Sequence, residues 1–212
     1  MVITNIEPQK KHKGRQSVFL DGSFAFGLSD FDLHRLHLKV GMELTEESLS
    51  SIRQDVLLQD MKQQALSLLD RHSYTEAAMR RKLLERGGEE ESVNETIAFL
   101  KSYRYIDDEG YARRYMTAAL SAGKSGMIKI KHDLSAKGIA RDIIDVVASE
   151  FDDEASAETE LEAIRQLLTK KLKGDFSFPS KMKAKRYLLS RGFSSSLIDS
   201  VLKKLGQEEF DF

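Results

Sequence analysis

Hydrophobic positions along most of the chain recur every three or four residues, which is the spacing of amphipathic helices. Short turns rich in glycine or acidic residues separate these segments, so we expect consecutive helices to be packed neighbours. After residue 45 no strand pattern remains. The predicted helices cover residues 31–38, 45–71 (continuous or broken once), 75–87, 93–103, 109–122, 127–137, 140–151, 155–173, 179–192 and 194–205.

The first 30 residues have a different pattern, that of a small antiparallel sheet. Two apolar segments, Gln16–Leu20 and Ser23–Leu28, flank the dipeptide Asp21-Gly22, which strongly favours a two-residue hairpin turn. A looser alternation over residues 2–6 adds a further strand candidate. We therefore predict either a hairpin plus one strand or a three-stranded antiparallel unit at the N-terminus.

A sequence pattern ending in glycine occurs three times in the helical part. Gly87, Gly138 and Gly192 each have a leucine four positions earlier and a basic residue immediately before them. The glycines are 51 and 54 residues apart, a nearly constant period that indicates tandem helical repeats. A basic residue in the last turn followed by glycine is typical of a helix C-terminus with a left-handed glycine at C′. Thus the leucine and glycine positions are expected to be structural.

Two further positions in each repeat are basic or histidine, seven and six residues before the glycine. They are either ordinary solvated helix charges or contacts to a partner, and their recurrence favours the partner. The residues are Arg80, Lys131 and Lys185 at the first position and Arg81, His132 and Arg186 at the second.

The overall charge conceals a segregation of signs. The chain has 33 Lys and Arg against 34 Asp and Glu, for a formal net charge of −1. The segments 75–87, 125–138 and 180–192 carry +2, +2 and +5, which leaves −10 for the rest of the chain. One helix in each repeat is therefore basic, as expected for a surface that binds a polyanion or an acidic partner.

Composition argues against most enzyme classes. There is no cysteine, which excludes disulfides, thiolate catalysis and the common structural zinc sites. Asp107-Asp108-Glu109 suits a helix N-terminus better than a metal cluster, and His34 and His37 lack a visible third ligand. No phosphate-binding glycine motif is present. We expect no catalytic, cofactor-binding or metal-binding residues and no cofactor. With no apolar run of membrane-spanning length and no secretory segment, we also expect a cytoplasmic protein without membrane contact.

Four segments together resemble the RecX family of recombinase regulators. They are Ala65–Gly87 (ALSLLDRHSYTEAAMRRKLLERG), Tyr105–Ala118 (YIDDEGYARRYMTA), Lys129–Ile139 (KIKHDLSAKGI) and Lys185–Phe193 (KRYLLSRGF). Their order and spacing match the family over about residues 59–205. Two features depart from the short form of the family. Residues 1–58 resemble the N-terminal extension that some members carry, and Tyr74 stands where a proline is expected.

The resemblance implies a mostly α-helical protein, a curved, elongated array of three three-helix repeats after the N-terminal β unit. We expect the boundaries at 1–58, 59–106, 107–151 and 152–212. The implied function is regulation of RecA, by binding in the groove of the RecA–DNA filament and modulating, usually inhibiting, its ATPase, strand-exchange and coprotease activities. A role in DNA repair, recombination and the SOS response follows. We expect a monomer that is not an enzyme and whose partners are RecA and its filament; direct contact with single- or double-stranded DNA is left open.

The basic residues on the repeated helices are the expected contacts, with alternatives at some positions. Lys137 and Arg191 suit the helix dipole equally well, and Tyr111 and Tyr115 suit packing better than base stacking. The expected contacts are Arg80, Arg81, Arg113, Arg114, Lys131, Lys137, Lys185, Arg186 and Arg191. The N-terminal group Lys10, Lys11, Lys13 and Arg15 either contacts phosphate or solubilises a loop. The competing function is a direct nucleic-acid binder built from helix-turn-helix-like repeats, which the near-neutral net charge disfavours.

Overall fold

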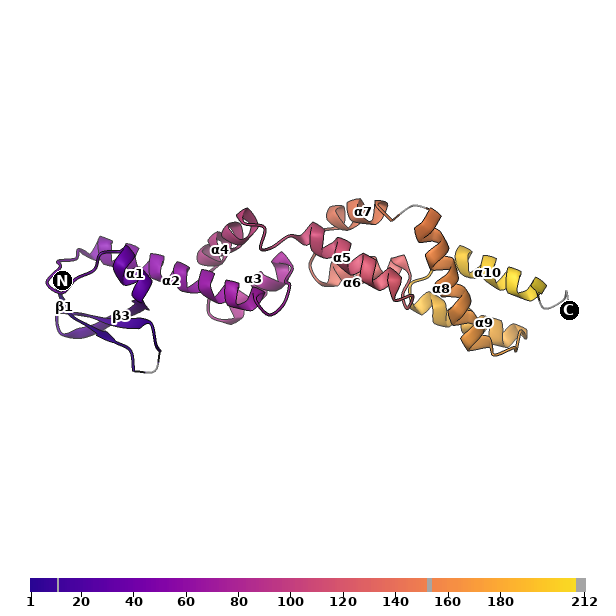
Figure 1. Ribbon diagram of the computed structural model, residues 1–212, viewed down its shortest axis with the longest axis horizontal. Coiled ribbons are helices and arrows are strands. Elements are labelled where there is room, and N and C mark those ends of the chain that lie inside the picture. The colour runs from indigo at the N-terminus through magenta and orange to yellow at the C-terminus, as the bar shows by residue number, and fades with distance from the viewer. Residues whose placement is uncertain (11, 152–153, 209–212) are drawn as a thin grey trace. The chain divides into compact units, whose positions relative to one another are not determined.

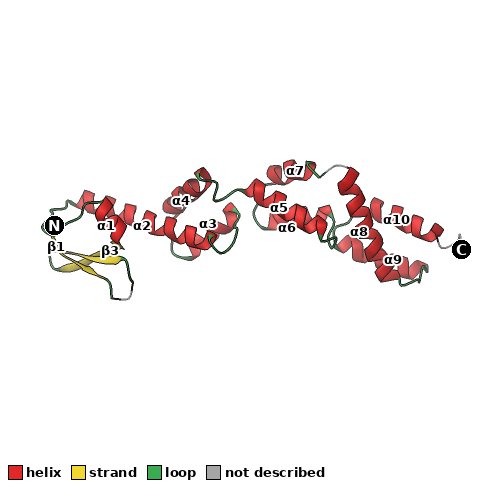
Figure 2. Cartoon of the chain, in the orientation of Figure 1, coloured by secondary structure: helices red, strands yellow, loops and turns green. Residues whose placement is uncertain are grey.

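The computed structural model describes residues 1–10, 12–151 and 154–208 (Figure 1). The chain forms two compact units, Met1–His72 with Leu83–Leu100, and Ser73–Lys82 with Lys101–Phe212. Strands among the described residues occur only near the N-terminus, and helices make up the elements that follow (Figure 2). The predicted fold class, mostly helical with a small N-terminal sheet, is confirmed.

The N-terminal sheet has three antiparallel strands in the order β1-β2-β3: β1 (Ile3–Pro8), β2 (Arg15–Leu20) and β3 (Ser23–Ser29). Asp21 and Gly22 connect β2 to β3 with φ of 47° and 82°, the two positive values that a type I′ hairpin turn needs. The three-stranded form is therefore the correct alternative, and the Asp-Gly hairpin is confirmed.

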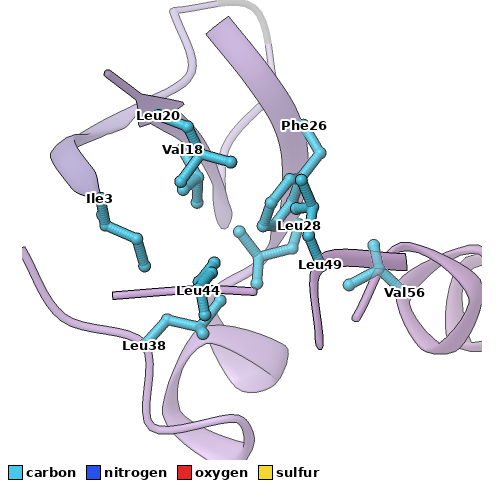
Figure 3. Close-up of a cluster of buried hydrophobic side chains, with 9 residues drawn as sticks. All are labelled: Ile3, Val18, Leu20, Phe26, Leu28, Leu38, Leu44, Leu49 and Val56. Atoms are coloured by element: carbon cyan, nitrogen blue, oxygen red, sulfur yellow. The ribbon is translucent and has the colours of Figure 1, made fainter. Parts of the chain in front are cut away.

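A hydrophobic core of its own supports this sheet (Figure 3). Apolar residues of the strands meet Leu38, Leu44 and the first half of the long helix α2 (Glu46–Leu69). The Thr45 side chain caps α2 by accepting a hydrogen bond from the Ser48 amide at 3.1 Å. The predicted cap is confirmed, and α2 is continuous. The buried members of this core are Ile3, Val18, Leu20, Phe26, Leu28, Leu38, Leu44, Leu49 and Val56.

The short helix predicted over residues 31–38 is smaller than expected. Helix α1 spans Asp30–Arg35. It ends there because His37 adopts a left-handed conformation with φ of 53°, which turns the chain and sends Leu38 into the N-terminal core. The apolar pattern extends beyond the end of the helix because Leu38 is buried in the core although it lies in a loop.

Among the residues that the structure describes, eight further helices follow α2. Each predicted helix in this part is present, with ends shifted by a few residues. They are α3 (Glu76–Glu85), α4 (Glu90–Ser102), α5 (Asp108–Ser121), α6 (Met127–Ala136), α7 (Arg141–Ser149), α8 (Glu154–Leu172), α9 (Phe178–Ser190) and α10 (Ser195–Glu208). None of the described helices is long and apolar enough to cross a membrane.

The helices after α4 pack in two groups of three, each with a separate core (Figure 1). The group α5, α6 and α7 buries Met116, Ile130 and Leu134 among other residues. The group α8, α9 and α10 buries Leu168, Leu188 and Phe193. Tyr111 and Tyr115 are partly buried against the first of these cores, so the prediction that they pack is confirmed.

Removing residues 1–58 is expected to leave a folded helical protein. All buried members of the N-terminal core lie between Ile3 and Val56, and the cores of the two later helix groups contain none of them. Residue 58 lies inside α2, whose remaining turns stay available to pack against α4, where Lys62 Nζ lies 5.1 Å from the centre of the Phe99 ring. Circular dichroism of residues 59–212 measures this, and a disordered spectrum would show that the sheet is required for the helical part to fold.

Candidate partner-binding surface

The three repeat glycines end the second helix of each repeat in the same way. Gly87, Gly138 and Gly192 have φ of 87°, 83° and 78°. The amide after each glycine donates to the carbonyl of the leucine four residues before it: Gly88 to Leu83, Ile139 to Leu134 and Phe193 to Leu188. This is the Schellman arrangement, with the glycine at C′. The predicted left-handed glycine cap is confirmed at all three positions.

Two of these turns also contact the second helix of the preceding repeat. A Cβ added to Gly138 would overlap the Cβ of Ala77 in α3, and one added to Gly192 would overlap the backbone nitrogen of Lys129 in α6. A Cβ on Gly87 would meet nothing within 4 Å. Gly138 and Gly192 therefore lie at contacts between repeats, where the backbones approach closely.

Hydrogen bonds join the same two places. The Thr75 hydroxyl, next to the start of α3, donates to the carbonyl of Lys137 at 2.7 Å. The Gly126 amide, at the N-cap of α6, donates to the carbonyl of Arg191 at 3.0 Å. The donors stand 12 positions before Gly87 and Gly138, and the acceptors are the C-cap residues of α6 and α9. In each case the C-terminus of one second helix meets the N-terminus of the preceding one, which aligns their dipoles favourably.

A carboxylate from the first helix of the next repeat completes each contact. Asp108 accepts a hydrogen bond from the Glu76 amide at 2.9 Å, at the start of α3. Glu160 accepts one from the Met127 amide at 3.3 Å, at the start of α6. Burial raises the pKa of both carboxyl groups despite these hydrogen bonds. Sequence reasoning did not predict these contacts between repeats. The signal in the sequence is a small residue, Thr75 or Gly126, that stands 12 positions before the repeat glycine Gly87 or Gly138.

Two of the three bases seven positions before the glycines pair with acids of their own repeats. Lys131 pairs with Asp145 at 2.9 Å, and Lys185 pairs with Asp199 at 2.6 Å. Each acid lies 14 positions after its lysine, on the third helix of the repeat, and the Lys131 hydrogen bond lowers the pKa of Asp145. These pairs give the base a structural role in the second and third repeats, without an external partner. In the first repeat Asn94 stands at the position of the acid.

The positions six before the glycines are the ones that face solvent. Arg81 and Arg186 are exposed, and the His132 side chain is 80% exposed. Arg186 makes no ion pair with any residue that the structure describes. We define these three residues as the outer register; it presents two guanidinium groups and an imidazole to solvent.

The residues directly before the glycines have their own internal contacts. Lys137 Nζ lies 5.9 Å and 5.5 Å from the ring centres of Tyr111 and Tyr115, and the Arg191 guanidinium lies 5.2 Å from that of Tyr187. Such cation–π contacts, together with the C-cap position, account for both bases structurally. Lys137 is exposed, so its ammonium group still has N–H donors available for a partner.

Arg113 and Arg114 differ in exposure, as the positions seven and six residues before the glycines do. Arg113 binds Glu109 at 2.7 Å and Glu150 at 2.6 Å, and the hydrogen bonds that it donates to Glu150, and then to Glu109, raise its pKa. Arg114 is exposed and has no ion pair within the described part of the chain. Arg114 is therefore the better placed of the two for an external contact.

The remaining candidates have structural roles where they are described. Asp107 caps α5 by accepting from the Gly110 amide at 2.9 Å, as predicted. Arg15 binds Asp60 through both terminal nitrogens at 2.7 Å, while Lys10 and Lys13 are exposed and Lys11 lies outside the described residues. Within residues 1–10, 12–151 and 154–208, no three His, Asp or Glu side chains come together as metal ligands.

Models of three protein-family domains match the chain. "Regulatory protein RecX N-terminal domain" matches residues 1–45, "RecX, first three-helix domain" residues 62–100 and "RecX, third three-helix domain" residues 158–202. The sheet with α1, the helices α2 to α4 and the group α8, α9 and α10 thus correspond to domains already described in this family.

Curated relatives and solved structures match over nearly the whole chain. "Regulatory protein RecX" of Clostridium acetobutylicum is 35% identical over 211 residues, covering 97% of each chain, and that of Clostridium botulinum (strain Eklund 17B / Type B) is 31% identical, covering 95% of each. A "Crystal structure of regulatory protein RecX" superimposes with a TM-score of 0.75 at 28% identity, covering 94% of this chain and 98% of that one. "RecX from Lactobacillus salivarius" gives 0.65 at 25% identity, covering 71% of this chain and 97% of that one.

Proposed function

The chain belongs to the RecX family of regulatory proteins, and we propose that it regulates the RecA recombinase by binding in the groove of the RecA–DNA filament. Bound there, it lowers the ATPase, strand-exchange and coprotease activities of RecA, and so acts in DNA repair, recombination and the SOS response in the cytoplasm. The observation that carries this proposal is the family match along almost the full length of both chains.

The proposed contact surface is the outer register, Arg81, His132 and Arg186, together with Arg114 and Lys137. All five residues are exposed, whereas Lys131, Lys185 and Arg113 are only partly exposed and lie in ion pairs with carboxylates of the same chain. Half-exposed ion pairs of this kind can exchange partners at little cost, because each contributes only about 0–1 kcal/mol. The paired bases, with Arg80 and Arg191, are therefore proposed as a second layer of contacts.

The protein is proposed to act as a monomer without catalytic residues of its own. Its three repeats are proposed to span residues 59–106, 107–151 and 152–212, after an N-terminal unit of residues 1–58. Repeats that contact one another through the ends of their second helices present those helices in succession, which suits a partner that itself repeats along a filament.

Binding measurements with three targets test the proposal. We expect the full chain to bind RecA filaments on single-stranded DNA at least about tenfold more tightly than either free RecA or bare DNA, at matched salt, because only the filament offers a continuous groove. The ATPase of the filament should fall in the same titration. Equal affinity for bare DNA and for the filament would favour the direct nucleic-acid binder and would reduce inhibition to competition for the strand.

A further inference from the structure

The end of α8, the turn that follows it and the start of α9 carry a dense group of lysines that sequence reasoning did not single out. We define the lysine patch as Lys170, Lys171, Lys173, Lys181 and Lys183. Four of these five residues, all but Lys181, line a surface pocket of about 470 Å³ together with Tyr187. Asp175 is the only acidic residue between Lys170 and Tyr187. The local charge is therefore strongly positive in a chain whose net charge is −1.

The fold does not use most of this charge. Lys170, Lys173 and Lys183 are exposed and make no ion pair with any described residue. Asp175 lines the same pocket and offsets one of these charges, but it makes no ion pair with a described lysine: its carboxylate accepts hydrogen bonds from the Ser180 hydroxyl and the Ser177 amide, and the Ser180 bond lowers its pKa. This contrasts with Lys185, whose charge is matched by Asp199. Clustered like charges repel one another, so the patch costs stability unless a polyanion binds.

Aromatic side chains accompany the lysines. Phe178, the first residue of α9, is 76% exposed, the highest value among the large hydrophobic residues that the structure describes. Lys171 Nζ lies 4.2 Å from the centre of the Tyr187 ring, and Lys181 Nζ lies 5.7 Å from that of Phe176. Lysines interleaved with an exposed aromatic ring form the kind of surface that binds single-stranded nucleic acid, with cations on the phosphates and the ring against a base.

We propose that the lysine patch and Phe178 bind single-stranded DNA, as a contact separate from the one that recognises RecA. Lys170, Lys173 and Lys183 bind backbone phosphates, and Phe178 stacks on a base. An acidic protein segment would satisfy the lysines but offers no flat ring for Phe178, so the pair of observations favours the nucleic acid. This goes beyond the proposed function, since the residues involved are not in the outer register.

Fluorescence anisotropy with a short labelled oligonucleotide and no RecA tests this proposal. For the full chain, a plot of log K against the logarithm of the salt concentration should have a slope of about −0.7 for each phosphate contacted. Replacing Lys170, Lys173 and Lys183 by glutamine should make that slope shallower by about 2. Phe178→Ala should weaken binding about tenfold and leave the slope unchanged, because stacking on a base neutralises no phosphate and therefore releases no counterions.

A matched control separates the patch from net charge. Glutamine at Lys39, Lys203 and Lys204, which are exposed residues outside the patch, removes the same three charges and should leave the slope unchanged. Circular dichroism checks that all variants fold. Identical slopes for both triple variants would overturn the proposal, as would equal competition by polyglutamate and by unlabelled oligonucleotide. Because this assay contains no RecA, either failure leaves the proposed function standing. Conversely, a full chain that binds the oligonucleotide but does not inhibit RecA would count against the proposed function alone.

Discussion

Charge reversal in the outer register, Arg81→Glu with Arg186→Glu, is expected to abolish inhibition of the DNA-dependent ATPase of RecA. Both residues are exposed at the same position of their repeats. A charged hydrogen bond to a partner is worth about 1.5–3 kcal/mol, so losing two should raise the half-inhibitory concentration roughly a hundredfold or more. The fold should survive, since exposed substitutions usually change stability by no more than about 0.5 kcal/mol each. ATPase assays on filaments and thermal melts of the variant provide the two measurements.

The structure changes which residues this experiment should target. From the sequence alone, Lys131 and Lys185 would be reversed together with Arg186. Glutamate at Lys131 or Lys185 would, however, face Asp145 or Asp199, so lost inhibition could reflect a weakened repeat. A control is the swapped pair Lys131→Asp with Asp145→Lys, which keeps an ion pair. Because it moves one second-layer contact and leaves the outer register intact, it is expected to lose much less inhibition than the Arg81/Arg186 variant. Full inhibition by the folded Arg81/Arg186 variant would exclude the outer register as the contact surface.

Alanine at Gly192 is expected to destabilise the protein more than alanine at Gly87, although both glycines have the same backbone conformation. At Gly87 the cost is that of a left-handed non-glycine residue, about 1–2 kcal/mol, because its Cβ meets open space. At Gly192 the Cβ also overlaps the backbone of Lys129, and overpacking typically adds about 1–3 kcal/mol. At about 2–4 °C per kcal/mol for a chain of this size, the difference is visible in a melt.

Gly138 allows this interpretation to be tested by compensation. Gly138→Ala should lie near Gly192→Ala in its effect, and Gly138→Val should be more severe. The atom that a new Cβ would overlap is the Cβ of Ala77, so Ala77→Gly should recover part of the loss when combined with Gly138→Ala. Thermal melts of the single and double variants measure the coupling. Equal melting temperatures for Gly87→Ala, Gly138→Ala and Gly192→Ala would show that the turns do not form contacts between repeats.

Local sequence determined the elements of this protein and their repetition. Helical periodicity, the Asp21-Gly22 hairpin, the Thr45 cap and the glycine at each C′ position all depend on residues close in sequence, so each could be predicted from its own segment. The family, too, followed from the order and spacing of these local patterns. Helix ends were less well determined, as the early end of α1 at Arg35 shows, because Leu38 contributes to the core from outside the helix.

Only the tertiary structure decided which of the repeated bases remain available. Nothing in the sequence around Lys131 shows that Asp145, 14 residues away on another helix, accepts a hydrogen bond from its ammonium group. Nor does it show that Arg186, beside Lys185, has no such acid among the described residues. The contacts of Thr75 with Lys137 and of Glu160 with Met127 likewise join residues 62 and 33 positions apart. Charge pairing and backbone approach at such separations depend on how helices pack, and a pattern read along one helix contains no information about which side chains the neighbouring helix brings to it.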